Sequence, residues 1–242
     1  MRSTAEQLNA AQIIITNTLA DAEIQLAVAH YGYSTAKMQE GKALHEGAVS
    51  AVNTQTACAG AQRTAAAQLQ TVEQEARDAY QALAQVARAV FANDRARLTT
   101  LGLNGGMPRT TAAFLAAAHA LFDNVLKSEE IKNALEGYGF DAAKVQTERA
   151  TIDVFERATQ HRESLKGAAQ QATLDQAGAL RAVREWVGQY LKIAKVALRG
   201  NKALLGKLGL TVRWGKTGAQ RTAAQRAAAT RKKNKELQQK AA

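Results

Sequence analysis

The chain repeats itself at one fixed spacing. The triplet Tyr31-Gly32-Tyr33 recurs as Tyr138-Gly139-Phe140, and Leu101-Gly102-Leu103 recurs as Leu208-Gly209-Leu210. The step along the sequence is the same in both cases, and we call this step, from Tyr31 to Tyr138, the repeat spacing. Applied without gaps, it also aligns Asn17 with Asn124, Lys37 with Lys144, Gly60 with Gly167 and Arg77 with Arg184. Self-similarity at a fixed period indicates a repeated structural unit. We therefore infer a tandem duplication of a unit of about a hundred residues.

The repeated glycines are typical of helix ends. Glycine takes the left-handed conformation that closes a Schellman motif, and the residue after it folds back on the last helical turn. Ser34 and Asp141, which follow the two aromatic triplets, are favoured N-cap residues. Each copy is therefore predicted to contain a helix, a turn at Gly32 or Gly139, and a new helix.

Other residues mark helix starts. Asp94 and Asn201 precede short segments that end on the second pair of repeated glycines. Asp21 and Ser128 are each followed two residues later by a glutamate, so they are further N-caps that divide the first helix of each copy. Residues 3–6 have the pattern of a capping box.

Two long segments, residues 35–92 and 142–199, contain no proline and have Gly60 or Gly167 near the middle. Apolar residues recur in them at steps of three and four, which is typical of a packed helix face. They are Leu69, Val72, Ala76, Ala79, Leu83, Val86 and Val90, and Leu180, Val183, Val187, Leu191, Ala194 and Leu198. We expect a tight turn at each glycine and hence a hairpin of two long helices. One continuous helix is the alternative.

Composition favours a helical chain, with one proline in 242 residues and 5% aromatic residues. That proline, Pro108, follows Gly105-Gly106 in the segment between the copies. We therefore predict an all-α protein of two tandem, pseudo-symmetric up-and-down helical bundles with a basic C-terminal tail. The predicted domains are residues 1–103, a linker at 104–109, residues 110–210, and a tail at 211–242 that is flexible or a solvated helix.

The sequence after the first turn resembles a group of known proteins. Tyr31-Gly32-Tyr33 is followed by Ala36, Lys37, Glu40, Gly41, Ala43 and Leu44. This pattern is similar to that of bacterial all-helical proteins that carry doubled units. The resemblance extends to about residue 213 and implies a repeated helical fold. It implies no activity, because none is attached to that group, and the basic tail lies outside it.

Positive charge is concentrated at the C-terminus. Residues 211–242 carry +8 of the chain's net charge of +11, which leaves +3 for the doubled body. The segment has few apolar residues larger than alanine and cannot build a core. The candidate residues for binding an anionic partner are Arg213, Lys216, Arg221, Arg226, Arg231, Lys232, Lys233 and Lys235.

Such a basic segment has several alternative roles. It can neutralise phosphates, which gives salt-sensitive and sequence-independent binding to nucleic acid. It can lie on an anionic membrane surface, although alanine side chains would not insert. It can also dock on an acidic face of another subunit, or remain a solvated tail that aids solubility.

No residue pattern predicts catalysis, a metal site or a cofactor. The four histidines are scattered outside the Glu-x-x-His pattern of four-helix di-iron proteins, and we interpret them as surface or interfacial residues. They are His30, His45, His119 and His161. Asp153, Glu156 and Glu129-Glu130 are interpreted as residues of helix starts and solvated faces. Gly105-Gly106 lacks the lysine and the strand of a phosphate loop.

The single cysteine, Cys58, excludes an intramolecular disulfide and favours a reducing compartment. The N-terminal residues lack a signal-peptide pattern, and no stretch approaches the roughly 18 apolar residues of a membrane helix. We therefore expect a soluble, cytoplasmic protein without a transmembrane segment.

Function is expected to depend on surfaces. We predict a non-enzymatic structural or interaction protein, a helical scaffold subunit that self-associates into a homo-oligomer or a larger assembly. Its basic tail is expected to dock on an anionic partner. The alternative is a nucleic-acid-associated protein that binds phosphates non-specifically through the tail.

Overall fold

The computed structural model describes residues 3–210, 226–227 and 230 of the chain. These residues form helices and connecting turns and contain no strand, so the prediction of an all-α fold is confirmed. The predictions for the tail at 211–242 lie outside the described residues, except at Arg226, Ala227 and Thr230.

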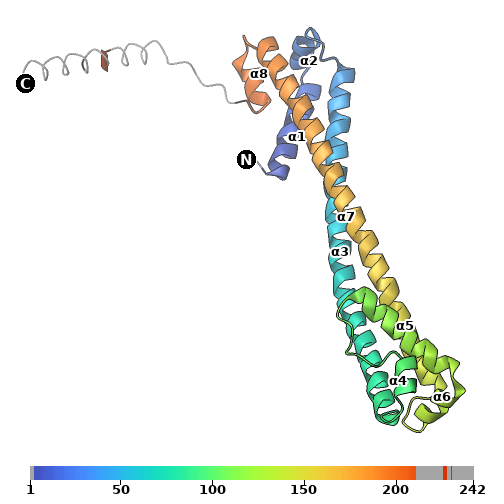
Figure 1. Cartoon of the computed structure of the whole chain (residues 1–242). Coiled ribbons are helices and arrows are strands. Elements are labelled where there is room, and N and C mark those ends of the chain that lie inside the picture. Colours follow the sequence, from blue (N-terminus) through green and yellow to red (C-terminus); the bar gives the residue numbers. More distant parts are fainter. Residues whose placement is uncertain (1–2, 211–225, 228–229, 231–242) are drawn as a thin grey trace, which may run out of the picture. The chain divides into compact units, whose positions relative to one another are not determined.

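Eight helices follow one another within residues 3–210 (Figure 1). They are α1 (Thr4–Ala20), α2 (Ala22–Ala29), α3 (Thr35–Val90), α4 (Arg95–Thr100), α5 (Thr111–Lys127), α6 (Glu129–Glu136), α7 (Ala142–Ala197) and α8 (Lys202–Lys207). Each of the last four begins and ends exactly one repeat spacing after its counterpart among the first four. Within the described part of the chain, no helix is both long and apolar enough to span a bilayer.

The predicted glycine turns have Schellman geometry. Positive φ among the described residues occurs at Gly32 (87°), Gly102 (72°), Gly139 (81°) and Gly209 (69°). The backbone N–H of the residue after each glycine donates to the carbonyl five residues earlier, as from Tyr33 to Val28 at 3.1 Å. Each glycine N–H donates to the carbonyl three residues earlier. These bonds satisfy carbonyls that a helix end leaves without partners.

The predicted N-caps are also confirmed. Asp21 accepts hydrogen bonds from the backbone N–H groups of Glu23 and Ile24, which separates α1 from α2. Ser128 caps α6 in the same way, and Ser3 forms a reciprocal capping box with Glu6. Local side-chain chemistry thus fixes where the short helices begin.

The predicted hairpins at Gly60 and Gly167 are wrong. Helices α3 and α7 each continue without a break for 56 residues, so the alternative of a continuous helix is correct. One glycine inside a helix costs only about 1 kcal/mol relative to alanine, and good helix formers on both sides offset that cost. Neither segment contains a proline that would force the chain to turn.

The chain divides into two compact units. Unit 1 takes its described residues from within 1–49 and 179–242, and unit 2 comprises residues 50–178. These units do not coincide with the predicted bundles at 1–103 and 110–210, because each unit combines segments from both. The physical reason is the continuity of α3 and α7, since a helix that does not turn back carries the chain out of the unit in which it starts.

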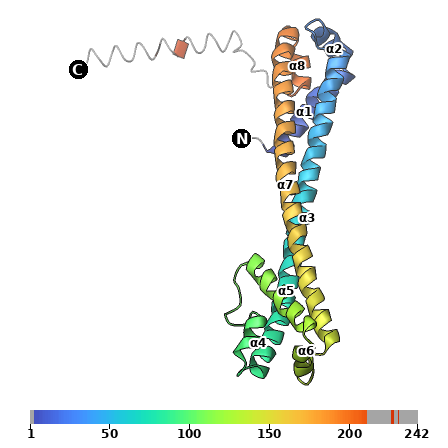
Figure 2. The same cartoon turned by 45° about the vertical axis from the view of Figure 1, so that its right-hand side comes forward.

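In unit 1, α1 and α8 lie beside the parts of α3 and α7 that belong to this unit (Figure 1, Figure 2). Trp186 stacks on Tyr190 with ring centroids 5.5 Å apart, and Tyr33 meets both rings edge-on. The hydroxyl groups of Tyr190 and Thr18 share a hydrogen bond of 2.5 Å. Gly41 faces this cluster, and a Cβ there would overlap the Trp186 ring. A glycine at this position therefore makes room for the indole.

In unit 2, α4, α5 and α6 surround the remaining parts of α3 and α7 (Figure 2). The ring of Phe114 meets Tyr80 and Phe155 edge-on, with centroids 5.5 and 6.0 Å away. The guanidinium of Arg77 lies over the same ring, 4.8 Å from its centroid. Phe114 is therefore the central aromatic residue of this core, and it fixes α5 against α3 and α7.

One hydrogen bond occurs at equivalent places in the two units. The side-chain amide of Asn17 donates to the carbonyl of Lys207 in unit 1, at 2.5 Å. In unit 2 the amide of Asn124 donates to the carbonyl of Thr100, at 2.6 Å. The two donors are separated by one repeat spacing, and so are the two acceptors. In each unit, donor and acceptor come from opposite halves of the chain.

Candidate functional site

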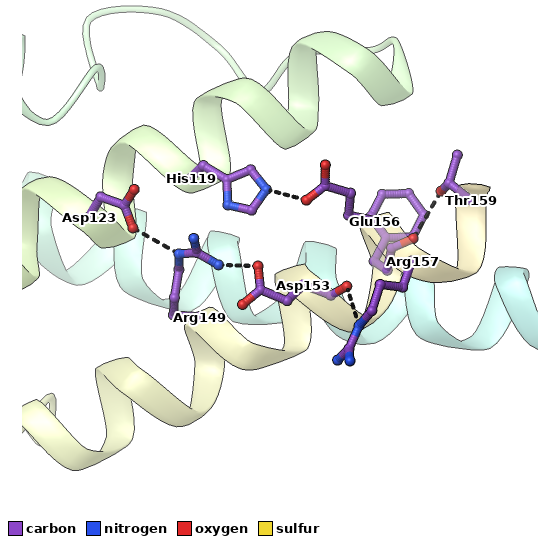
Figure 3. Close-up of polar contacts among 8 residues, drawn as sticks. His119, Asp123, Arg149, Asp153, Glu156, Arg157 and Thr159 are labelled. Atoms are coloured by element: carbon purple, nitrogen blue, oxygen red, sulfur yellow. Dashed lines mark hydrogen bonds and ion pairs between the residues drawn. The ribbon is translucent and has the colours of Figure 1, made fainter. Parts of the chain in front are cut away.

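A cluster of ionisable side chains lies between α5 and α7 in unit 2 (Figure 3). Helix α5 contributes His119 and Asp123, while α7 contributes Arg149, Asp153 and Glu156. Residues three or four apart share one face of a helix, so both sets point in one direction. Helix α6 and the turn at Gly139 connect α5 to α7, and the two sets of side chains face each other (Figure 3).

One contact of the cluster joins His119 to Glu156. The ring atom Nε2 lies 3.1 Å from Oε2 of the carboxylate. The histidine side chain is 24% exposed and the glutamate side chain 42%. The other ring nitrogen, Nδ1, is buried without a hydrogen-bond partner. A buried polar atom without a partner is unfavourable by about 1–3 kcal/mol, so the ring is incompletely satisfied.

A second set of contacts is centred on Arg149. Its Nε donates to Oδ1 of Asp123 at 2.8 Å, and its Nη1 donates to Oδ1 of Asp153 (Figure 3). The hydrogen bond to Asp123, supported by that to Asp153, raises the pKa of the guanidinium above its ordinary value. Arg149 thus bridges α5 and α7 as a permanently charged group.

Three residues of the cluster combine metal-ligand chemistry. His119, Asp153 and Glu156 each offer one ligand atom, and these atoms lie within 4.8 Å of one another. Imidazole nitrogen and carboxylate oxygen are ligands of divalent transition metals. The sequence predicts solvated or interfacial positions for these three residues, and the structure instead brings them together on facing helices.

The neighbouring polar groups of α7 bond to their own helix. Arg157 Nε donates to the carbonyl of Asp153 at 3.2 Å, and the Thr159 hydroxyl donates to the carbonyl of Phe155 at 2.9 Å (Figure 3). The hydroxyl proton is therefore directed at the backbone carbonyl, not at a side-chain base. The side chains left to carry chemistry in this arrangement are His119, Asp153 and Glu156.

Unit 1 has a groove at the corresponding positions. The residues one repeat spacing earlier in the sequence are Gln12, Thr16, Lys42, Glu46 and Val49. All five line a groove of about 620 Å³ along α1 and α3. Lys42 pairs with Glu46 on its own helix at 3.8 Å, whereas Arg149 reaches across to α5. At these equivalent positions, only unit 2 has an ion pair that joins its two helices.

The other predicted positions are dispersed. His45 contacts the carbonyl of Leu8 through Nε2 at 3.2 Å, and His30 and His161 are exposed. Of the candidate residues in the tail, Arg226 is exposed and its carbonyl accepts a hydrogen bond from Thr230. The rest lie outside the described residues, namely Arg213, Lys216, Arg221, Arg231, Lys232, Lys233 and Lys235. A site for an anionic partner in this segment stays a prediction.

A sequence signal for the cluster exists but is weak. Asp153 and Glu156 stand three residues apart on a predicted helix, which is a ligand spacing, but His119 precedes Glu156 by 37 residues. Pairing them requires the register of α5 on α7, which no local pattern encodes. Comparison with known proteins gives no further guide, since no family model, curated protein or solved structure matches the chain.

Proposed function

We propose that this chain is a non-enzymatic helical scaffold subunit that arose by duplication and self-associates. The observation that carries the proposal is the recurrence, at the repeat spacing, of the helix bounds and of the hydrogen bond made by Asn17 and Asn124. A duplicated, pseudo-symmetric body has two versions of each surface. Two versions of one surface allow a chain to join two neighbours, as a building block of an assembly does.

The exposed tyrosines Tyr31 and Tyr138 support self-association. They occupy equivalent positions directly before the left-handed glycines and are 46% and 65% exposed. The next aromatic residues, Tyr33 and Phe140, are buried against their units, so each turn holds one ring inside and offers one outside. Tyrosine is enriched in the cores of protein interfaces. We infer that these two turns are the points of contact between subunits.

Light scattering on the purified chain at micromolar concentration tests the proposal. The intact chain and the chain without residues 211–242 are both expected to form oligomers. The double variant Tyr31→Ser, Tyr138→Ser is expected to shift the oligomers toward monomer. Leu174→Ser is the matched control, because Leu174 is 67% exposed but its counterpart in the first copy is Ala67. A strictly monomeric wild-type chain would contradict the proposal.

The basic tail is proposed to dock on an anionic partner, and nucleic acid is the second candidate. The observation that favours it is the +8 charge of residues 211–242. Binding to duplex DNA is expected to fall steeply with salt, because neutralised phosphates release counterions. It is expected to vanish when residues 216–242 are deleted. Unchanged DNA binding by the deleted chain would rule this role out.

A further inference from the structure

We propose that His119, Asp153 and Glu156 bind one divalent transition-metal ion between α5 and α7. The juxtaposition that carries this inference is that of an imidazole from one helix with two carboxylates from the next, with their ligand atoms within 4.8 Å of one another. The site goes beyond the proposed scaffold function and does not depend on self-association.

The spacing of the ligand atoms fits a coordination shell. His119 Nε2 and Glu156 Oε2 are 3.1 Å apart. Two ligands bonded to zinc at about 2.1 Å are separated by about 3.0 Å at a right angle and about 3.4 Å at a tetrahedral angle. Asp153 lies one helical turn before Glu156 on continuous α7, so both carboxylates are held on one face by a rigid element.

The charges around the site favour a cation. Three carboxylates, those of Asp123, Asp153 and Glu156, lie beside the guanidinium of Arg149 and the imidazole of His119 (Figure 3). A second guanidinium, that of Arg157, bonds the backbone carbonyl of Asp153 at 3.2 Å. Arg149 hydrogen-bonds Oδ1 of Asp153. An outer partner of this kind orients a ligating carboxylate. A bound divalent ion offsets the excess negative charge.

The ring of His119 has one nitrogen that faces Glu156 and one that is buried without a partner. A neutral imidazole has one N–H and one bare nitrogen, and only Nε2 has a partner in this structure. A metal ion bound at Nε2 replaces the proton that this nitrogen shares with Glu156. Unit 1 lacks this chemistry, because the counterparts of His119 and Glu156 are Gln12 and Val49.

The test is titration of the metal-free full chain with zinc in a calorimeter and with cobalt by visible absorption. We expect one ion per chain. His119→Gln introduces the residue that unit 1 has at the equivalent position, and it is expected to weaken zinc binding by more than about 100-fold. Glu156→Gln is expected to act in the same direction. The matched control is His161→Gln, which changes an exposed histidine of α7. It is expected to leave the zinc affinity unchanged.

Circular dichroism of each variant checks that the helices persist. Nitrogen NMR of the wild-type histidine rings gives a readout that needs no variant, since zinc is expected to shift one of the four imidazoles. Absence of saturable binding to the wild-type chain overturns the proposal. Binding that His119→Gln leaves unchanged also overturns it. The oligomeric state, measured separately, reports on the scaffold proposal alone.

Discussion

Gly41 lies against the ring of Trp186, where an added Cβ would overlap the indole. Gly47, on the same helix, has open space around its Cα. Gly41→Ala is therefore expected to destabilise the protein by about 1–3 kcal/mol through overpacking. Gly47→Ala is expected to stabilise it by up to about 1 kcal/mol, because alanine has the higher helix propensity. Urea unfolding followed by circular dichroism measures both, and equal effects would contradict the packing described for unit 1.

Glu148, at the position equivalent to Gly41, has a buried Oε2 without a hydrogen-bond partner. Burial raises the pKa of this carboxyl above its ordinary value of 4.5, and nearby Lys144 opposes the shift. The folded state therefore binds more protons than the unfolded state between the ordinary and the raised pKa. Stability then falls as pH rises through that range and stays reduced above it.

Glu148→Gln removes this ionisation. The variant is expected to be more stable than the wild type at pH 7, and the difference is expected to shrink at pH 4, where the wild-type carboxyl is largely protonated in both states. Urea midpoints across this pH range measure the effect. A wild type and variant with parallel pH profiles would show that Glu148 is not responsible.

At the scale of elements, the central glycines of α3 and α7 act as ordinary helical residues. Gly60 and Gly167 have open space around them and lack positive φ. Replacing both with alanine is expected to raise the free energy of unfolding by about 1–2 kcal/mol, from two gains in helix propensity. If either glycine formed a left-handed turn, the substitution would destabilise the protein instead. Thermal and urea unfolding distinguish the two outcomes.

The short helices were predictable because their signals are local. The turn at Gly32 and the cap at Ser34 require only residues a few positions away in the sequence. The continuity of α3 was not predictable in this way, because a glycine in a helix-forming segment is compatible with both a turn and a helix. The outcome depends on whether the helix formers on both sides offset the cost of the glycine. The contact of His119 with Glu156 was not predictable either, because it depends on the register of α5 on α7.

At the scale of the whole molecule, the core of unit 1 joins opposite ends of the chain. Its buried cluster combines Ile24 and Met38 with Trp186 and Tyr190. A chain cut between Gly106 and Met107, in a non-helical segment, is therefore expected to yield two fragments that are unstable alone. Mixed in equal amounts, they are expected to recover the wild-type helical signal and a cooperative melt. A monomeric fragment 1–106 as stable as the intact chain would contradict this expectation.

The hydrogen bond from Asn17 to Lys207 spans 190 residues and sets an order of events during synthesis. The ribosome makes α1 and α2 first, but their packing partners in α7 and α8 emerge only after all of unit 2 has been made. At about 5–20 residues per second, this delay is on the order of ten seconds. Unit 2, whose residues are contiguous, can fold meanwhile. Until then, the apolar faces of α1 and α2 lack the part of their core that α7 and α8 supply, which includes Trp186, Tyr190 and Leu204.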